Sequence, residues 1–339
     1  GVYNPINVTY INNIPKILFT YWVMSNLTFM RFMTLYTLKK HHPDYEIILY
    51  YPKKRITQKT WTSFENKIEV NCKCYKKYLV LLNIRIIGID FENDLPDIPF
   101  YLSEVIKSDF FRLLVCKEVG GIWFDMDTFW INNIQNAIDN DNDNNNYYED
   151  LVTLNKTYNT DNSLDNSSSM LSKGYDYSYF VMCSKKQDNV DKNFPHFCQY
   201  ILLHNNKSKL VKLLYDSCLS HLNCDQYESI GTPMFSKILS KYILYDKDYN
   251  YNKNILNINC FAPYKWFQME ELFEKTIEIN LDNTSCLHWF NGSPYSKKFI
   301  ENYSHYNIDS MKECSFKNIY NKYITNEDKL FLKNMDSSI

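Results

Sequence analysis

Apolar and polar positions along the first 130 residues follow two alternating periods. Short β-branched and aromatic runs predict strands, and longer stretches with an apolar residue every three or four positions predict helices. The predicted strands are 14–23, 45–51 and 84–88, and the predicted helices are 27–42, 56–82 and 105–119. Strands that alternate with helices are typical of a mostly parallel sheet, whose ligands bind beyond the carboxyl ends of the strands. We therefore expect an α/β fold.

The second half of the chain is less regular. Residues 136–169 contain low-complexity runs of Asn, Asp and Ser, which predict a polar, solvent-exposed insertion. After it, the pattern predicts a strand at 177–183, helices at 197–204, 208–222 and 234–245, and a strand at 285–290. The remainder, 296–339, is rich in Lys and Asn and predicts a helix and a tail.

One segment, 106–130, combines a helix, a glycine turn and two carboxylates. Asp109 and Arg112 interrupt an apolar helical pattern three residues apart, so they lie on one helical face. The pair 120–121 is Gly-Gly, which suits a left-handed backbone after the helix. The alternation that follows predicts a strand with Asp125 and Asp127 on one side, roughly 7 Å apart. Two such carboxylates suit a hard cation, Mn²⁺ or Mg²⁺, and through it a diphosphate.

Two sequence patterns carry a family resemblance. The run S-D-x-x-R-x(7)-G-G-I-W-x-D-x-D resembles the DXD-containing sugar-nucleotide glycosyltransferases, in particular family 32 and the catalytic segment of the large glucosylating toxins. The amino-terminal run I-P-K-I-L-F-T-Y-W is similar to the same family, although Phe19 stands where the family has His and Tyr21 where it has Ile. The resemblance spans roughly 14–300 and implies a GT-A type, Rossmann-like fold with a helical C-terminal part.

On this resemblance the chain is one glycosyltransferase domain, 1–339. It would divide into a nucleotide-binding half, 14–130, the polar insertion, 136–169, and an acceptor-side half with a C-terminal metal-ligand segment, 177–300. Asp125, Asp127 and His288 would hold Mn²⁺ or Mg²⁺ against the diphosphate, and an aromatic ring at 21 or 22 would stack on the nucleobase.

The resemblance also implies a set of site residues. Asp109 and Arg112 would bind hydroxyls of the donor sugar. The catalytic candidates are Asp109, Arg112 and Asp127; the donor-binding candidates add Tyr21, Trp22, Gly121 and Asp125; the metal ligands are Asp125, Asp127 and His288; further pocket candidates are Glu228, Gly231, Thr232 and Trp289.

Structural interpretations of these residues stay open. Asp109 and Arg112 are also consistent with an exposed ion pair of little energetic value. Trp22 is equally typical of a core residue, and a lone His on an apolar strand is usually structural. The run at 231–233 fits an ordinary helix start, with Thr232 as the cap and Pro233 in the first turn.

Three functions are consistent with these residues. The first is a retaining, metal-dependent hexosyltransferase that moves a sugar from a UDP-sugar, or alternatively a GDP-sugar, to a glycan or protein acceptor. The second is a catalytically degenerate protein that binds sugar nucleotides or glycans. The third is a metal-dependent nucleotide-sugar hydrolase or nucleotidyltransferase. The intact carboxylates and the Asp109–Arg112 pair argue against the second.

The composition of the chain limits which classes of binding partner and which cellular locations we expect. The formal net charge of −2 over 339 residues gives no electrostatic reason to expect nucleic-acid binding. No apolar run approaches the roughly 18–20 residues of a membrane helix. Ten cysteines form no C-x-x-C pair, so we expect reduced thiols and favour a cytoplasmic location. A secretory lumen would require an anchor removed ahead of Gly1.

Overall fold

The computed structural model describes residues 5, 7–23, 26–54, 72–140, 178–183, 196–226, 229–245 and 255–339. These residues group into two compact units. The first unit comprises Gly1–Tyr21, Asp90–Phe124 and Ile138–Ile258, and the second comprises Trp22–Ile89, Asp125–Ala137 and Asn259–Ile339. The predicted halves, 14–130 and 177–300, have other boundaries and stay a prediction.

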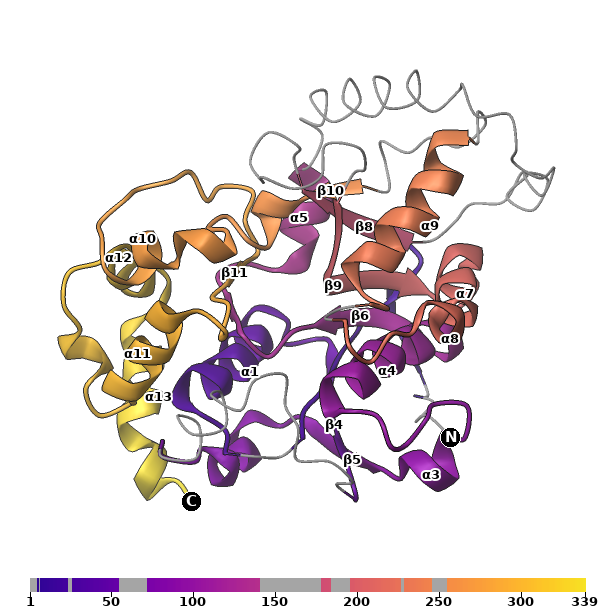
Figure 1. The fold of residues 1–339 in the computed structure, drawn as a ribbon. Helices are drawn as coiled ribbons and strands as arrows, with labels where there is room; N and C mark the ends of the chain where they lie inside the picture. Colours follow the sequence, from indigo (N-terminus) through magenta and orange to yellow (C-terminus); the bar gives the residue numbers. More distant parts are fainter. Residues whose placement is uncertain are drawn as a thin grey trace. The chain divides into compact units, whose positions relative to one another are not determined.

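Within the described residues, the first unit contains a sheet of five strands and a separate pair of short strands. Its elements are β1 (Tyr10–Ile11), β2 (Ile14–Pro15), β3 (Ile17–Tyr21), α3 (Phe91–Asp94), α4 (Glu104–Glu118), β6 (Gly120–Phe124), β8 (Ser178–Cys183), β9 (His196–Asn205), α7 (Lys209–Asp216), α8 (Cys218–His221), α9 (Thr232–Tyr245) and β10 (Ile255–Asn257). The strand order is β10-β8-β9-β6-β3. β3 runs parallel to β6 and β10 parallel to β8, whereas β9 runs antiparallel to both of its neighbours. Helix α4 packs on β6, and α9 lies across β9 (Figure 1).

The second unit combines a parallel strand pair with a helical C-terminal part. Its elements are α1 (Phe29–His41), β4 (Glu46–Pro52), the 3₁₀ helix η1 (Lys76–Leu82), β5 (Arg85–Ile89), β7 (Thr128–Trp130), α5 (Ile134–Asn140, which continues into the first unit), η6 (Trp266–Gln268), α10 (Met269–Phe273), β11 (Cys286–His288), α11 (Pro294–Asn302), η7 (Ile308–Ser310), α12 (Ser315–Tyr323), α13 (Asn326–Asn334) and η8 (Met335–Ser337). A short η5 (Ile258–Cys260) begins at the last residue of the first unit. β4 and β5 are parallel, and β7 and β11 are antiparallel.

These elements confirm the predicted α/β fold class with a helical C-terminal part, and the GT-A type stays a prediction. The predicted strands and helices of the first 130 residues are present wherever the structure describes the chain, with η1 as the described end of the predicted helix 56–82. Within the described residues, no helix combines the length and apolar character needed to cross a membrane.

The helix predicted at 197–204 is wrong, because these residues form β9. The run F-C-Q-Y-I-L-L-H is apolar on both sides, so its periodicity does not separate a buried strand from a buried helix. In the structure β9 is hydrogen-bonded between β6 and β8, and its residues Phe197, Ile201, Leu202 and Leu203 are fully buried. Pairing on both edges decides in favour of the strand.

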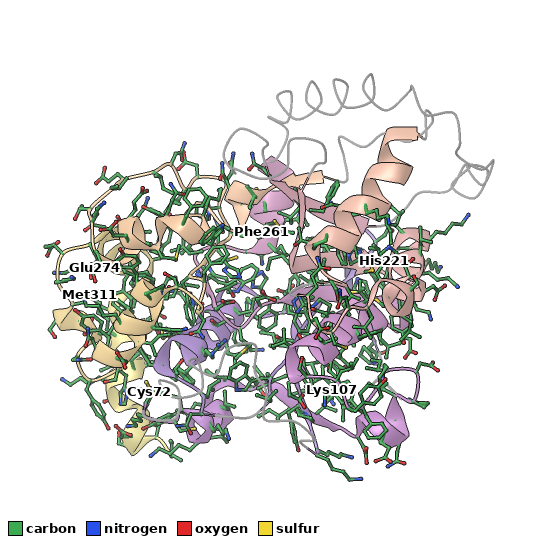
Figure 2. The ribbon with its side chains drawn as sticks, viewed as in Figure 1. Cys72, Lys107, His221, Phe261, Glu274 and Met311 are labelled. Atoms are coloured by element: carbon green, nitrogen blue, oxygen red, sulfur yellow. The ribbon has the colours of Figure 1, made fainter. Side chains whose placement is uncertain are left out.

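The C-terminal helices form a packed layer of their own. Phe316 of α12 contacts the rings of Phe273 and Phe299 from α10 and α11. Beside them, Glu274 and Met311 line one small pocket, and both side chains are labelled in Figure 2. These contacts come from residues far apart in the sequence, and they hold α10, α11 and α12 together.

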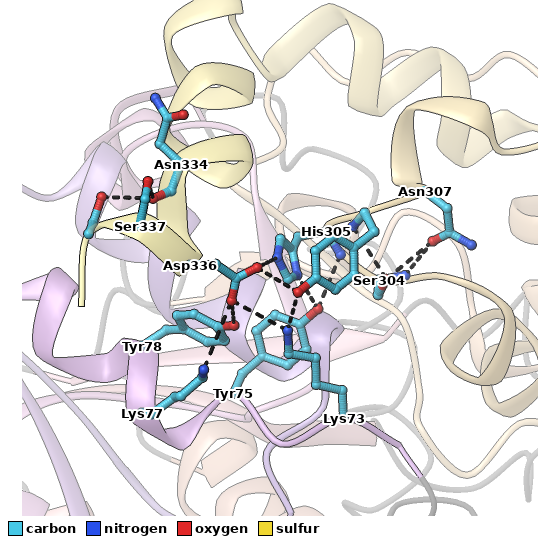
Figure 3. Close-up of polar contacts among 12 residues, drawn as sticks. Lys73, Tyr75, Lys77, Tyr78, Ser304, His305, Asn307, Asn334, Asp336 and Ser337 are labelled. Atoms are coloured by element: carbon cyan, nitrogen blue, oxygen red, sulfur yellow. Dashed lines mark hydrogen bonds and ion pairs between the residues drawn. The ribbon is translucent and has the colours of Figure 1, made fainter.

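The last helical turn is tied to η1 by a polar cluster around Asp336 (Figure 3). The Asp336 carboxylate accepts a hydrogen bond from Tyr306 Oη at 2.6 Å and one from the Tyr78 hydroxyl, and it lies 3.0 Å from His305 Nε2. His305 Nδ1 in turn lies 2.6 Å from Tyr75 Oη. The tyrosine and histidine hydrogen bonds hold the pKa of Asp336 well below its usual range, so the Asp336 carboxylate stays ionised.

Candidate active site

The two aspartates of the D-x-D run lie in a turn. β6 ends at Phe124, so the predicted strand through Asp127 is too long. The chain turns here because Thr128 Oγ1 donates a hydrogen bond back to the carbonyl of Asp125, at 3.0 Å. The expectation that both carboxylates face one side still agrees with the structure, since the two carboxylates and one imidazole gather in a single cluster.

Two threonines of α1 hold this turn in place. Thr34 Oγ1 lies 3.0 Å from the carbonyl oxygen of Met126 and also within hydrogen-bond distance of the Thr128 carbonyl. The backbone N–H of Trp130 donates to Thr37 Oγ1 at 3.0 Å. All of these groups are buried, so the carboxylates sit on a frame whose backbone polar groups are satisfied.

A C-terminal strand brings the histidine to the aspartates. β11 pairs antiparallel with β7, which places His288 opposite Thr128. Just beyond β11, the backbone N–H of Trp289 donates to the Asp127 carbonyl at 2.9 Å, and that of Asn291 donates to Asp127 Oδ2 at 3.0 Å. The site therefore joins residues more than 160 positions apart.

The resulting Asp-Asp-His cluster could hold a metal ion. His288 Nε2 lies 3.2 Å from Asp127 Oδ1 and 3.5 Å from Asp125 Oδ2, and one ligand atom from each residue lies within 4.8 Å of the other two. The His288 side chain is 5 % exposed, whereas the Asp125 and Asp127 side chains are 25 % and 17 % exposed. One side of the cluster is thus open to a ligand.

The electrostatics of the cluster favour a cation. Burial lowers the pKa of His288, but the carboxylates of Asp127 and Asp125 raise it by more, so the pKa ends above its usual value. A positive charge among these three groups is therefore stabilised, whether carried by a proton or by an ion. Carboxylate oxygens with one imidazole nitrogen are ligands that Mn²⁺ accepts, so the residues present fit a hard divalent cation.

Trp22 and Trp289 both lie near a cation that the sequence reasoning missed, Arg31 on the first turn of α1. The Arg31 guanidinium carbon lies 4.1 Å from the centre of the Trp22 ring and 5.8 Å from that of Trp289. Arg31 is 8 % exposed. The one available signal was a single arginine within the otherwise apolar start of the helix at 27–42.

Asp109 and Arg112 form a buried ion pair on α4 of the first unit. Arg112 Nη2 lies 3.0 Å from Asp109 Oδ1, and the two residues are 6 % and 3 % exposed. The Arg112 guanidinium also lies 4.4 Å from the centre of the Trp123 ring. The exposed, energetically weak pair considered from the sequence is therefore not what the structure contains.

A second buried ion pair lies one turn earlier on α4. Lys107 Nζ lies 2.6 Å from Glu104 Oε1, and Glu104 also accepts a hydrogen bond from the hydroxyl of Tyr21. Lys107 is labelled in Figure 2. The Tyr21 ring packs against Phe91 and Phe111 and is 5 % exposed, so its faces are covered by protein. Stacking of Tyr21 on a nucleobase stays a prediction.

The remaining candidates lie in the first unit. Gly121 has φ +120° on β6, and a Cβ there would lie 2.8 Å from the carbonyl oxygen of Ile17, so only glycine fits. Thr232 is the first residue of α9, and the Gly231 carbonyl accepts from the N–H of Phe235 at 3.0 Å, which is an ordinary helix start. Glu228 lies outside the described residues. Donor contacts by these residues stay predictions.

In the comparison with known protein families, one family model matches the segment that contains the D-x-D run. Residues 31–148 match the family described as "Glycosyltransferase sugar-binding region containing DXD motif". No curated protein matches the chain.

Among solved structures, the chain is similar to a PaToxG glycosyltransferase (14 % identity, 68 % of this chain and 70 % of that one, TM-score 0.38). It is similar to the UDP-bound glycosyltransferase domain of the YGT toxin (10 %, 76 % and 82 %, 0.37). It is also similar to the galactosyltransferase LgtC in complex with donor and acceptor sugar analogues (12 %, 91 % and 96 %, 0.33). These likenesses are too distant to assign a donor or an acceptor.

Proposed function

We propose that the protein is a metal-dependent, retaining hexosyltransferase. The match of residues 31–148 to a DXD-containing glycosyltransferase sugar-binding region supports the predicted enzyme class, glycosyltransferase. The protein would move a sugar from a UDP-sugar, or alternatively a GDP-sugar, to a glycan or protein acceptor. The observation that carries this proposal is the Asp125–Asp127–His288 cluster, which lies at the end of the D-x-D run and is open on its carboxylate side.

Each residue of the cluster has a distinct task in the proposed reaction. Asp125 and Asp127 supply the two negative charges, and His288 supplies a neutral nitrogen once its proton has left. A bound Mn²⁺ or Mg²⁺ would screen the charge that develops on the departing nucleoside diphosphate. Asp127 is held by two hydrogen bonds, since the N–H of Asn291 donates to its side chain and the N–H of Trp289 donates to its backbone carbonyl.

Donor recognition is proposed for two further groups. Trp22, half-buried and capped by the Arg31 guanidinium, would stack on the nucleobase. Asp109 and Arg112 would bind hydroxyls of the donor sugar, with the forked guanidinium held by Asp109, the Ser108 side chain and the Trp123 ring. Their burial means that few other groups would need to be ordered when the sugar binds.

The test is a panel of UDP- and GDP-sugars with and without Mn²⁺. A ligand that binds only the folded protein raises its melting temperature by mass action, so we expect one sugar nucleotide to stabilise the protein only with Mn²⁺. The same donor should then be consumed, and NMR of the product should show retention of the anomeric configuration.

Other outcomes separate the competing functions. Stabilisation by a donor that is never consumed, with any acceptor, would favour a binding protein. Release of free sugar without an acceptor product would favour a hydrolase, and no response to any donor would contradict all three.

A further inference from the structure

Arg31 is a buried cation beside the Asp-Asp-His cluster. Its guanidinium lies over the Trp22 ring and near that of Trp289, at 4.1 and 5.8 Å from the ring centres. Trp289 directly follows the ligand candidate His288, and its backbone N–H donates to Asp127. The guanidinium therefore belongs to the same small region as the cluster.

Two hydrogen-bond donors in this region lack an acceptor. The indole Nε1 atoms of Trp22 and Trp289 are both buried and have no hydrogen-bond partner among the described residues. Trp289 is only 1 % exposed. A buried donor without a partner is costly, and such a group in a native protein often marks a ligand position. A guanidinium and two free indole N–H groups together would suit an oxyanion.

Charge balance indicates that the oxyanion is a diphosphate. Two carboxylates already match the charge of one divalent ion, so the metal cluster alone leaves a bound diphosphate uncompensated. The diphosphate carries one negative charge on each phosphorus and gains another as the sugar leaves. A buried arginine is the side chain best suited to that group, because its fork of N–H donors matches phosphate oxygens.

We propose that Arg31 binds the diphosphate of the donor. This inference rests on the proposed function and assigns a residue that the D-x-D run does not include. The face of the Arg31 guanidinium packs on Trp22, and its N–H groups take the phosphate. The structural alternative is that Arg31 serves only to pack the two indole rings.

The decisive measurement compares a nucleotide with its nucleoside. UDP and uridine are titrated into the wild-type protein and the R31Q variant in the presence of Mn²⁺, with GDP and guanosine in parallel. If Arg31 binds phosphate, R31Q should lower the affinity for the nucleoside diphosphate by about ten- to a hundredfold and leave the affinity for the nucleoside unchanged. An equal loss for both ligands, or no loss for either, would overturn the inference.

Two further variants keep the test sharp. R85Q removes a guanidinium from the half-exposed Arg85–Glu46 pair of the same unit and should change neither affinity. If R31Q does not fold, R31K replaces it. Lysine keeps the positive charge but lacks the forked N–H donors of arginine, so the affinity for UDP should fall several-fold and the affinity for uridine should not change. Wild-type protein that binds no diphosphate with Mn²⁺ would overturn the proposed function and this inference with it. Diphosphate binding that R31Q leaves intact would overturn the inference alone.

Discussion

Replacing His288 by Gln tests the proposed metal site directly. The imidazole nitrogen of His288 lies 3.2 Å from the Asp127 carboxylate and 3.5 Å from that of Asp125, and the pKa of His288 is raised above its usual value. A proton on His288 therefore occupies the place where a cation would bind. Mn²⁺ must displace that proton, so its affinity should depend on pH.

The size of the pH effect on Mn²⁺ affinity follows from the number of protons that each bound ion releases. At pH values below the pKa of His288, each bound Mn²⁺ releases one proton, and the affinity falls about tenfold per pH unit. Above that pKa the affinity levels off. H288Q removes the titrating group and one ligand. At high pH its affinity should be at least about ten- to a hundredfold weaker, since even outer-shell changes have effects of that size.

Isothermal titration of Mn²⁺ between about pH 5 and 8, the range in which histidine titrates, measures both quantities. H305Q is the matched control, because His305 also lies beside a carboxylate of the second unit, 3.0 Å from Asp336. It should bind Mn²⁺ like the wild type. Equal pH slopes in the wild type and H288Q would refute the reasoning, as would an unchanged affinity at high pH.

Three further predictions concern catalysis and stability. D127N should abolish Mn²⁺-dependent turnover in a donor-consumption assay while the fold persists, and full activity would remove the metal role of Asp127. Burial lowers the pKa of His42 to about 4 from 6.5, so the unfolded state binds more protons between these values. The free energy of unfolding should therefore fall as pH drops from 6.5 to 4, by up to about 3 kcal/mol more than in H42Q. Urea titrations of both proteins across this pH range measure the difference, and an equal loss in both would contradict the prediction. G121A should lower the free energy of unfolding by more than about 2 kcal/mol, because φ is +120° and the new Cβ meets a carbonyl. G88A should lower the free energy of unfolding by less, because its new Cβ meets only side-chain atoms of Lys53 and Tyr51. A larger loss in G88A than in G121A would contradict the steric argument.

The sequence predicted the segments whose local pattern agrees with their tertiary setting. Helix α4, the positive-φ glycines after it and the carboxylate pair are all encoded within one stretch of 25 residues, so local rules sufficed. His288 was reached only through the family resemblance, since a lone His on an apolar strand is usually structural. The structure brings it to Asp125 and Asp127 through the pairing of β11 with β7.

The errors share a physical cause. β9 was misassigned because a strand buried on both faces has the same apolar content as a buried helix, and only pairing with β6 and β8 separates them. The end of β6 was misplaced because hydrogen bonds from Thr34 and Thr128 turn the chain at Asp125. Arg31 was missed because its significance lies in two tryptophans, one of them more than 250 residues away in sequence.

The hydrogen bonds from α1 to the D-x-D turn have a consequence for mutational scanning. Thr34 and Thr37 are not among the candidate ligands, yet their hydroxyls bond the backbone at Met126, Thr128 and Trp130. A saturation library scored for turnover should therefore show two intolerant positions one helical turn apart, accepting Ser but neither Val nor Ala. Their pattern of tolerance would resemble that of ligands. The functional footprint of this site thus extends along a helix that never needs to contact the ion.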